Sequence, residues 1–305
     1  MTKVLVTGAT GFIGRHAIAP LQEQGYEVHT LGSRPLDKAF SGVTHHQADL
    51  LDSGQMERVI AAVQADQLLH FAWYVTPGEY LQSFNNIRWV YATLEMLRIF
   101  EENGGTRAVL AGTCFEYDLQ RGFLTEDVTA TRPDSLYGSC KNALRQMVEG
   151  YSGQCGLSTA WGRIFFLYGP HEYPGRLVAS VINAVLRGED ANCSHGRQIR
   201  DFMHVQDVAD AFVALLESEV AGTVNIASGQ PVSIGDIAYR IAGQAGREGL
   251  VKLGVHPAPA NEPPVILGDT RKLNNIVGWK PSISLDDGLA RTIDWWETQP
   301  AGTSG

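Results

Sequence analysis

The sequence predicts an α/β fold in which a doubly wound parallel sheet carries a smaller C-terminal α/β lobe. A buried strand, a glycine-rich turn and the start of a helix follow one another within residues 2–14. Strand and helix patterns then alternate up to about residue 170, as in consecutive βαβ units. Beyond that point the pattern breaks into shorter pieces. We therefore expect one domain over 1–170, to which the chain returns near 205–227, and a second lobe mainly over 171–305.

Composition narrows the range of partners. The 305 residues carry a formal net charge of −9 and no cluster of Lys and Arg, which argues against a nucleic-acid-binding protein or a polybasic membrane patch. We find no signal-peptide pattern and no run of about 18 apolar residues, so we expect a cytoplasmic protein with no membrane partner. The four cysteines lack zinc-ligand spacing, which predicts reduced thiols and no metal site; they are Cys114, Cys140, Cys155 and Cys193.

Three glycines in the first turn predict a dinucleotide site of the Rossmann type. Gly8 allows the tight turn, Gly11 lets the backbone approach a pyrophosphate, and Gly14 lets the helix pack closely against the strand. The helix N-terminus adds unpaired N–H groups and a partial positive charge. An ordinary tight βα turn is the alternative, and the position between a strand and a helix weighs against it. The other cofactor contacts expected from this turn are Thr10, Phe12 and Ile13.

The end of the second expected strand, 26–31, indicates which dinucleotide binds. A NAD site usually places an acidic residue there to accept a hydrogen bond from the ribose 2′-hydroxyl. Here Gly32 is followed by Ser33 and Arg34, whose hydroxyl and guanidinium suit a 2′-phosphate. We therefore expect NADP(H) as the cofactor; the alternative is that Arg34 is a solvated loop cation.

The third expected strand, 43–48, ends at Asp49 and Leu50, where a carboxylate would lie near the adenine amino group. A solvated loop carboxylate is an equally good interpretation of Asp49. Further strands are expected at 67–72, 107–112, 159–167 and 223–226, with short strands within 191–205. Helices are expected at 15–24, 53–64, 81–103, 136–151, 177–186, 208–217, 234–245 and 285–296.

A tyrosine and a lysine on one helix are the candidate catalytic pair. Tyr137 and Lys141 are four residues apart, so both project from one face of the expected helix. The lysine cation would favour the phenolate, and the hydroxyl of Thr113, at the end of an expected strand, would bind the same substrate oxygen. Taken alone, a Tyr and a Lys at this spacing are common on solvated helix faces. The combination with Thr113 and the glycine turn is more specific.

Several further motifs accompany this pair. They are Thr7–Gly14 (T-G-x-x-G-x-x-G), His70–Ala72 (H-x-A), Thr113–Tyr117, Arg163–Pro170 (R-x-x-N-x-Y-G-P with Phe166 in place of Asn) and Arg200–Val205. Together they resemble the extended short-chain dehydrogenase/reductase family, in particular its nucleotide-sugar epimerases, dehydratases and ketoreductases. The resemblance covers nearly the whole chain.

The resemblance implies roles for these residues. Tyr137 would donate or accept the proton, Lys141 would bind the nicotinamide ribose, and Thr113 would orient the substrate carbonyl or hydroxyl. Arg200 resembles the arginine that binds a nucleotide diphosphate; a structural ion pair with Asp201 or Asp207 is the alternative. Further cofactor contacts are expected at Phe71, Ala72, Trp73, Asn86, Ala111 and Ile164, and substrate contacts at Cys114, Phe166, His171, Arg176, Leu177, Arg200 and Glu262. The family also implies a homodimer that pairs the helices at 81–103 and 136–151.

Departures from the family pattern favour one subclass. The dehydratases carry Asp-Glu after the active-site Thr, where this chain has Cys114-Phe115, so dehydration is disfavoured. Pro259 replaces a second phosphate-binding Arg of many relatives. We therefore expect NADPH-dependent reduction of a keto group on a nucleotide-diphosphate sugar, most simply a 4-keto-6-deoxysugar, with Tyr137 as proton donor. The alternatives are an epimerase using His171 or Cys114 as acid or base, a dehydratase, and a non-catalytic NADP(H)-sensing protein.

Overall fold

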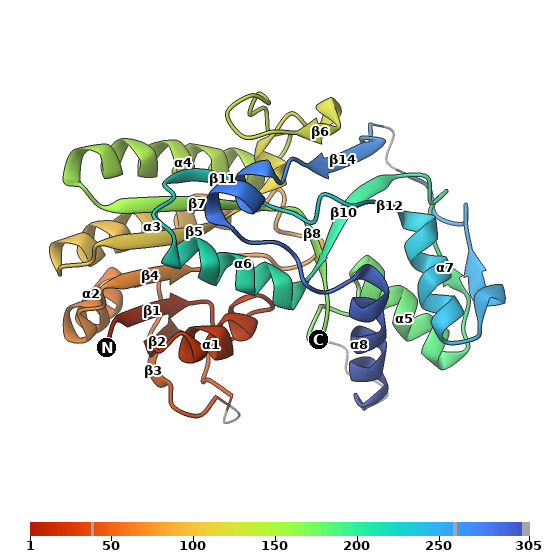
Figure 1. Cartoon of the computed structure of the whole chain (residues 1–305), viewed down its shortest axis with the longest axis horizontal. Helices are drawn as coiled ribbons and strands as arrows, with labels where there is room; N and C mark the ends of the chain where they lie inside the picture. The colour runs from red at the N-terminus through yellow and green to blue at the C-terminus, as the bar shows by residue number, and fades with distance from the viewer. Residues whose placement is uncertain (38–39, 259–260, 301–305) are drawn as a thin grey trace.

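The central feature of the fold is a parallel sheet. The computed structural model describes residues 1–37, 40–258 and 261–300. Within these residues, seven strands pair in the order β11-β7-β5-β4-β1-β2-β3, and every pair is parallel (Figure 1). The strand order reverses between β1 and β4, which is the predicted doubly wound arrangement. The strands are β1 (Lys3–Thr7), β2 (Glu27–Gly32), β3 (Thr44–Gln47), β4 (Gln67–His70), β5 (Arg107–Thr113), β7 (Ser158–Ile164) and β11 (Gly222–Ile226).

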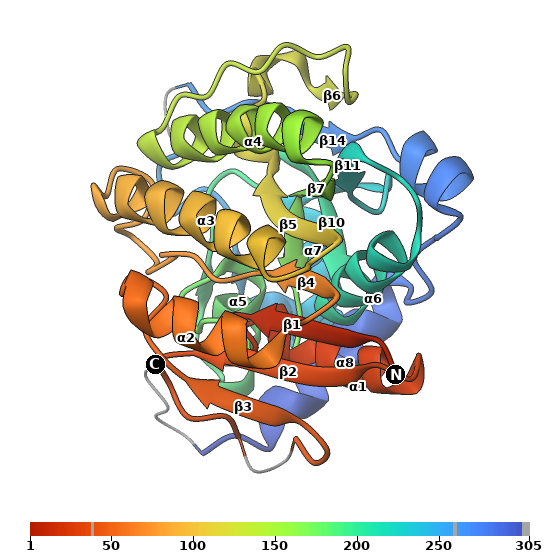
Figure 2. The same ribbon diagram turned by 90° about the vertical axis from the view of Figure 1, so that its left-hand side faces the viewer.

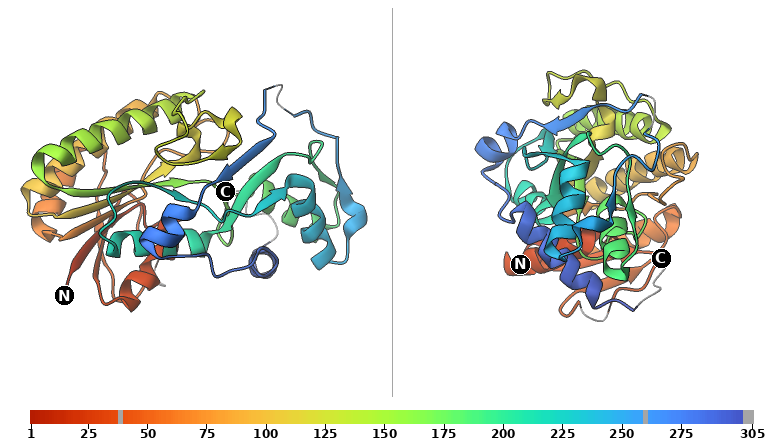
Figure 3. Two further views of the ribbon diagram at one scale, coloured as in Figure 1. Left: turned by 45° about the horizontal axis from the view of Figure 1, so that its top comes forward. Right: turned by 90° about the vertical axis from the view of Figure 1, so that its right-hand side faces the viewer.

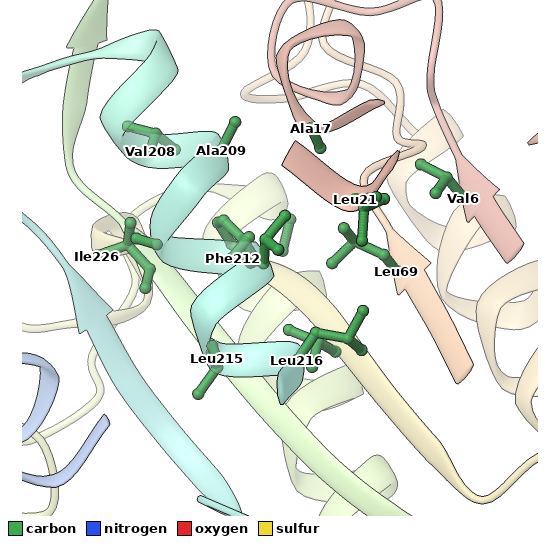
Figure 4. Close-up of a cluster of buried hydrophobic side chains, with 14 of the residues drawn as sticks. Val6, Ala17, Leu21, Leu69, Val208, Ala209, Phe212, Leu215, Leu216 and Ile226 are labelled. Atoms are coloured by element: carbon green, nitrogen blue, oxygen red, sulfur yellow. The ribbon is translucent and has the colours of Figure 1, made fainter. Parts of the chain in front are cut away.

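One face of this sheet is covered by α1 (Gly14–Glu23) and α6 (Val205–Glu217). Figure 4 shows their apolar side chains meeting those of β1, β4 and β11. Phe212 of α6 is completely buried there, and its ring centroid lies 5.0 Å from that of Phe71. Gly162 of β7 makes room for this ring, because a Cβ atom at Gly162 would lie 2.6 Å from it. The segment 205–226 therefore returns the chain to the central sheet and closes its core on this side.

The opposite face is covered by α2 (Ser53–Val63), α3 (Asn85–Glu102) and α4 (Leu136–Cys155), which lie side by side in Figure 2. Their buried side chains recur at helical spacing, as an amphipathic helix requires. Neither these helices nor any other in the described part of the chain combines the length and the apolar character needed to cross a membrane. The buried side chains include Met56, Ile60, Val63, Met96, Leu97, Phe100, Leu144 and Val148.

Shorter strands form a second sheet. Among the described residues it runs in the order β12 (Pro231–Ser233), β10 (Ile199–His204), β14 (Val265–Gly268) and β6 (Phe123–Leu124), and β8 (Phe166–Tyr168) pairs with the second half of β10. Three helices share a separate buried core: α5 (Leu177–Arg187), α7 (Ile234–Gln244) and α8 (Leu285–Glu297). Figures 1 and 3 show these helices together at the end of the molecule away from the N-terminus.

The remaining described elements are short. β9 (Ala191–Asn192) pairs with β13 (Val251–Lys252). Three 3₁₀ turns and one π-helical turn complete the chain; they are η1 (Cys114–Glu116), η2 (Leu119–Arg121), η3 (Glu248–Leu250) and the π-helical η4 (Leu273–Val277).

Most expected elements are found with ends shifted by one or a few residues, and contacts in the structure explain three of the differences. The helix expected at 81–103 begins at Asn85, because the carbonyl of Leu81 accepts a hydrogen bond from the Tyr137 N–H instead of continuing a helix. The strand expected at 159–167 divides into β7, in the central sheet, and β8, in the second sheet. The helix expected at 208–217 begins at Val205, because the His204 side chain caps it through the N–H of Gln206.

A division of the chain at residue 170 stays a prediction. β6 and β8 precede that residue and yet pair with strands of the second sheet. The site described below therefore draws residues from both sheets.

Candidate functional site

The glycine turn forms a narrow cradle between β1 and α1. Gly8 has a positive φ of 74°, and a Cβ atom there would lie 2.7 Å from the Ala72 backbone N. A Cβ atom at Gly14 would lie 2.8 Å from the Gly8 carbonyl carbon and nearer still to its oxygen. Gly11 donates its N–H to Gly8 O at 2.9 Å, which closes the turn. This backbone fits the close approach of a pyrophosphate to a helix N-terminus. The other predicted residues of the turn, Thr10, Phe12 and Ile13, lie in this cradle.

The end of β2 carries the Arg34 cation near a second cation, Arg15, which forms an ion pair with Asp37 at 3.8 Å. Ser33 and Arg34 follow Gly32 and are both exposed. Arg15, in the first turn of α1, lies near enough for Arg34 to lower the pKa of its guanidinium; burial contributes more to that shift and Asp37 opposes it. The local electrostatics are therefore compatible with a 2′-phosphate at this corner.

Asp49 and Leu50 follow β3. The Asp49 carboxylate accepts the N–H of Leu51 at 2.9 Å, which fixes the turn into α2. Leu50 is buried and lines a groove between the start of α2 and the outer side of α3. The structure thus gives Asp49 a local structural role beside the predicted one at the adenine.

The end of β4 lies beside the glycine cradle. The N–H of Phe71 donates to Thr7 O at 3.1 Å, which keeps this strand in register with β1. His70 is buried between the hydroxyls of Thr7 and Thr93, and burial lowers its pKa to about 3. It is therefore a neutral, structural histidine.

Thr113 and Tyr137 meet at the end of β5. Thr113 is the last residue of that strand and pairs in register with Ile164 of β7, another predicted cofactor contact. Tyr137 lies in the first turn of α4, which begins at the cap formed by Ser135. Burial raises the pKa of the Tyr137 hydroxyl, and its hydrogen bond with Thr113 opposes that shift. The two predicted residues thus form one buried pair of hydroxyls.

Lys141 lies one helical turn beyond Tyr137 and is 3% exposed. Its Nζ donates to the Ala111 carbonyl at 2.9 Å and lies 3.6 Å from the centroid of the Trp73 ring. Burial lowers the pKa of the Lys141 ammonium to about 7, and the Glu116 carboxylate opposes this. The predicted Thr113, Tyr137 and Lys141 set is therefore brought together, with Trp73 against the lysine.

Asn86 supports Trp73. Its Oδ1 accepts the indole N–H of Trp73 at 2.8 Å, and its Nδ2 donates to the carbonyls of Tyr80 and Ser83. Asn86 is completely buried. Asn86 therefore holds Trp73 and the turn before α3, and its expected contact with the cofactor stays a prediction.

Tyr80 is a neighbour of the catalytic pair that was not predicted, and it joins the pair to the predicted Arg176. The ring of Tyr80 meets the Tyr137 ring edge-on at 5.0 Å, and the Arg176 guanidinium lies 5.3 Å from the Tyr80 centroid. Arg176 thus reaches the site through Tyr80, whereas Leu177 begins α5 and packs against the core of the second sheet. The segment 73–80, between an expected strand and an expected helix, has no pattern that would have indicated this placement.

Glu116 is the other residue that sequence reasoning missed. Its carboxylate is completely buried and accepts the Thr113 N–H at 2.9 Å and the Arg163 Nε at 2.8 Å. A sequence signal was present: Thr113 and Glu116 have the S/T-x-x-E spacing of a capping box, and they form one at η1.

Aromatic rings line the path from Tyr137 to Arg200. The Phe115 ring lies 6.5 Å from the rings of both Tyr137 and Phe166, and the Arg200 guanidinium lies 5.6 Å from the Phe166 centroid. Phe202 continues this wall, 5.6 Å from Phe166. Phe115 and Phe166 thus place apolar surface at two positions where the family pattern given above has polar residues, the second of the dehydratases' Asp-Glu pair and the Asn of R-x-x-N-x-Y-G-P.

Arg200 has a partner that differs from the two considered above. Its guanidinium donates to Glu262 Oε1 at 2.8 Å and to the Pro263 carbonyl at 2.9 Å. Asp201 instead accepts the N–H groups of Ser228, Gly229 and Gly268, and Asp207 accepts those of Ser282 and Ile283. The ion pair therefore joins two predicted substrate residues, Arg200 and Glu262. Pro259 lies outside the described residues.

Cys114 and His171 do not join the catalytic set. Cys114 is 1% exposed within a small apolar cluster, and burial raises its thiol pKa well above the usual range. His171 packs against the Trp295 ring at 4.6 Å and near the His16 ring at 6.2 Å. Burial, followed by nearby Arg15 and His16, lowers the His171 pKa to about 4. Neither residue is placed as the acid or base of an epimerase.

Comparison with known proteins agrees with this geometry. A sequence model of the NAD dependent epimerase/dehydratase family matches residues 4–227. UDP-glucuronic acid decarboxylase 1 of Xenopus tropicalis is 28% identical over 317 residues, covering 97% of this chain and 72% of the relative. UDP-glucose 4-epimerase of Halalkalibacterium halodurans is 25% identical over 332 residues, covering 99% and 97%.

A solved structure confirms the fold class. UDP-glucose 4-epimerase of Thermus thermophilus, in complex with NAD, has a TM-score of 0.87 to this chain at 24% identity. The match covers 97% of this chain and 99% of the epimerase. At this level of identity the likeness establishes the fold.

Proposed function

The chain belongs to the NAD dependent epimerase/dehydratase family, and we propose that it oxidises and re-reduces C4 of a nucleotide-diphosphate sugar, as a 4-epimerase does. The observation that carries this proposal is the buried Thr113–Tyr137 hydroxyl pair beside Lys141, with Cys114 and Phe115 in place of an acid–base pair. Such a site supports proton transfer at one oxygen, and positions 114 and 115 offer no carboxylate for eliminating water. The nearby Glu116 carboxylate is engaged by Thr113, Trp161 and Arg163. The names of the relatives favour UDP as the nucleotide.

The residues would act in sequence at one sugar oxygen. Thr113 binds the C4 oxygen, and Tyr137 takes its proton as the hydride leaves carbon. Lys141, as an ammonium, stabilises the phenolate that Tyr137 needs in order to act as a base. A nicotinamide cofactor held by the glycine cradle and Lys141 would supply the reversible hydride acceptor that this reaction needs. After the oxidised sugar rotates in the site so that its other face is presented, Tyr137 returns the proton to the C4 oxygen.

A 4-ketoreductase is the second candidate; one observation favours it, and so would the NADPH preference proposed below. The wall formed by Phe115 and Phe166 offers apolar surface suited to the methyl group of a 6-deoxysugar. A cofactor site that prefers NADPH would also draw on a pool kept largely reduced. In this reaction Tyr137 is the proton donor to the C4 oxygen, and the hydride is consumed.

We propose NADP(H) as the preferred cofactor, on the basis of Ser33 and Arg34 after β2 and of Arg15 in the first turn of α1. The Thermus thermophilus relative contains NAD. Fluorescence titration with NADPH and NADH tests the preference. Arg34→Ala should weaken NADPH binding by roughly tenfold or more and leave NADH binding unchanged. Equal affinities in the original protein, or equal losses in the variant, would argue against a 2′-phosphate site.

Product analysis separates the two reactions. The protein is incubated with UDP-glucose, UDP-galactose or UDP-glucuronate and a catalytic amount of cofactor, and products are resolved by chromatography and NMR. Isomerised sugar without cofactor consumption supports the epimerase. A second incubation supplies NADPH and nucleotide-linked 4-keto-6-deoxysugars. Stoichiometric NADPH oxidation in that incubation alone establishes the ketoreductase. A lack of turnover with every sugar would contradict both candidates and favour a cofactor-sensing protein.

The substrate diphosphate would bind at Arg200, and the protein would act as a homodimer. Arg200 lies at the far end of the aromatic path from Tyr137, at a position suited to the phosphates when the sugar reaches the tyrosine. Its ion pair with Glu262 would then have to share the guanidinium with the ligand. The dimer would use α3 and α4, whose exposed apolar side chains are considered in the Discussion.

A further inference from the structure

We propose that Glu116 is a positioning residue of the active site, whose buried carboxylate fixes Thr113 and supplies the negative charge that keeps Lys141 an ammonium. The proposal concerns the site of the proposed function. Only the measurement of turnover rests on the proposed function; the NMR titration does not need it.

The first part rests on hydrogen bonds at the end of β5. Glu116 Oε1 accepts the backbone N–H of Thr113 at 2.9 Å and the indole N–H of Trp161 at 2.8 Å. Glu116 Oε2 accepts Arg163 Nε at 2.8 Å. Both carboxylate oxygens are therefore engaged, and they connect β5 to β7 directly behind the Thr113 hydroxyl.

The backbone leaves room for this carboxylate at Gly112. A Cβ atom on Gly112 would lie 2.8 Å from Glu116 Oε1 and would overlap the indole of Trp161. Glu116 itself is 0% exposed, so its charge is desolvated and acts over short distances with little screening. The sequence thus places a glycine, an acid and an indole so that the carboxylate fits beside the catalytic strand.

The second part rests on the charges that surround Lys141. From β4, His70 is neutral, because burial lowers its pKa to about 3. From its own helix, Tyr137 is a neutral hydroxyl until it acts. Arg163 from β7 forms an ion pair with Glu116, and Arg145 from α4 lies 4.0 Å from the same carboxylate.

Among the described groups around the lysine, Glu116 is therefore the one with a negative charge. Lys141 Nζ lies 5.9 Å from the centroid of the Trp161 ring, and the indole N–H of that ring donates to Glu116 Oε1 at 2.8 Å, so one indole separates the ammonium from the carboxylate. Burial lowers the pKa of Lys141 to about 7, and Glu116 acts in the opposite direction. Near pH 7 the protonated and neutral forms of Lys141 are thus similarly populated, and a change in nearby charge should shift the ratio between them. Loss of the Glu116 charge should lower the Lys141 pKa further, whereas loss of the Arg163 charge should raise it.

These opposite shifts make the test independent of any substrate. Lysine is labelled with ¹³C at Cε, and each of the six lysine signals is titrated by NMR between pH 5.5 and 9. The signal that disappears in Lys141→Arg belongs to Lys141. We expect Glu116→Gln to lower the Lys141 midpoint by about one unit or more, and Arg163→Gln to raise it. Both variants lose one partner of a buried ion pair and should lose similar thermal stability.

A purely structural role for Glu116 would give a different pattern. Both variants would then lose stability while the Lys141 midpoint stayed within 0.2 units of its original value, or moved in the same direction in both. Either result would overturn the proposal. If Glu116→Gln does not fold, Arg163→Gln still decides the electrostatic part, because an unchanged midpoint there contradicts it.

Turnover supplies the second readout once a substrate is known. Glu116→Gln should lower kcat more than KM and should shift the pH profile in the same direction as the NMR midpoint. Glu116→Asp, which keeps the charge, should keep the Lys141 midpoint near its original value. A lack of turnover in the original protein would contradict the proposed function, whereas a fixed Lys141 midpoint would contradict the role of Glu116.

Discussion

Tyr137 is the residue that would exchange a proton with the substrate, and it is buried beside Thr113. Tyr137→Phe removes the hydroxyl and keeps the ring that packs against Tyr80 and Phe115. We expect turnover to fall by roughly 10²–10⁴, because general acid–base catalysis contributes about that much. Cofactor affinity by fluorescence and thermal stability should change little, since the ring contacts remain.

An exposed tyrosine provides the control for this substitution. Tyr239→Phe removes a hydroxyl from the surface of α7, where the side chain is 46% exposed, and should leave turnover unchanged. Turnover retained in Tyr137→Phe would remove Tyr137 from the catalytic set. An equal loss of turnover in both variants would indicate inactivation during preparation and not the removal of a catalytic hydroxyl.

Glu172 predicts a pH dependence of stability. The residue is 6% exposed near the first turn of α5, and burial raises its pKa to about 8. The unfolded chain loses this proton near pH 4.5, whereas the folded chain keeps it up to about pH 8. Between pH 4.5 and about pH 8 the folded state binds more protons than the unfolded state, so the contribution of Glu172 to the free energy of unfolding falls as the pH rises.

Glu172→Gln should therefore stabilise the protein at pH 8 and not at pH 4.5. The expected gain at pH 8 is roughly 2–4 kcal/mol by the linkage relation, measured by urea unfolding at both pH values. A variant that is less stable by the same amount at both values would show that the side chain contributes through its shape alone.

Individual residues differ in how well the sequence predicts their roles. Thr113, Tyr137 and Lys141 are predictable because strand ends and helical spacing place them together. Cys114 is adjacent to Thr113 in sequence, and its burial depends on contacts with distant residues such as Phe165 and Ile266. Local sequence carries no signal for such contacts.

At the scale of elements, hydrophobic periodicity predicts most helices and strands and misses where the chain changes sheet. The run at 159–167 is mostly apolar, and no feature of the local sequence shows that Phe165 separates β7 from β8. The separation follows from pairing with β11 and β10, which are more than 30 residues away in sequence. Tertiary pairing therefore decides this boundary.

The contact between β1 and α1 gives a prediction at the same scale. Gly14→Ala would place a methyl group 2.8 Å from the Gly8 carbonyl carbon and 3.0 Å from Ala9 Cα, all of it backbone that cannot rotate away. We expect α1 to shift, with a loss of roughly 1–3 kcal/mol in the free energy of unfolding and a loss of cofactor binding. Urea unfolding and fluorescence titration measure the two effects.

Gly153→Ala is the matched control on α4. A Cβ atom there meets nothing within 4 Å, so the same substitution should raise stability by about 0.5–1 kcal/mol through helix propensity. If Gly14→Ala bound the cofactor as the original protein does, the cradle would not be the dinucleotide site.

At the scale of the whole molecule, the site lies where the two sheets meet. β7 and β8 are consecutive in sequence, one in each sheet, and Thr113 at the end of β5 pairs with the last residue of β7. The cradle and the catalytic set come from the central sheet, whereas Phe166, Arg200 and Glu262 come from the second sheet or its loops. Movement of the two sheets relative to each other would therefore change the length of the path from Tyr137 to Arg200.

The outer surface of α3 predicts the assembly of the molecule. Phe84, Ile87 and Tyr91 are spaced along one stripe and are 80%, 53% and 73% exposed. Met147 on the neighbouring α4 is 52% exposed. Contact between two copies through these helices would cover this apolar surface, and we expect a homodimer at micromolar concentration.

Ile87→Glu combined with Tyr91→Glu should produce monomers in sedimentation velocity, because each buried carboxylate would lack a partner. Val128→Glu adds the same charge at a side chain that is 80% exposed elsewhere and should leave the dimer intact. A monomeric original protein, or a dimer that survives both α3 substitutions, would exclude this interface.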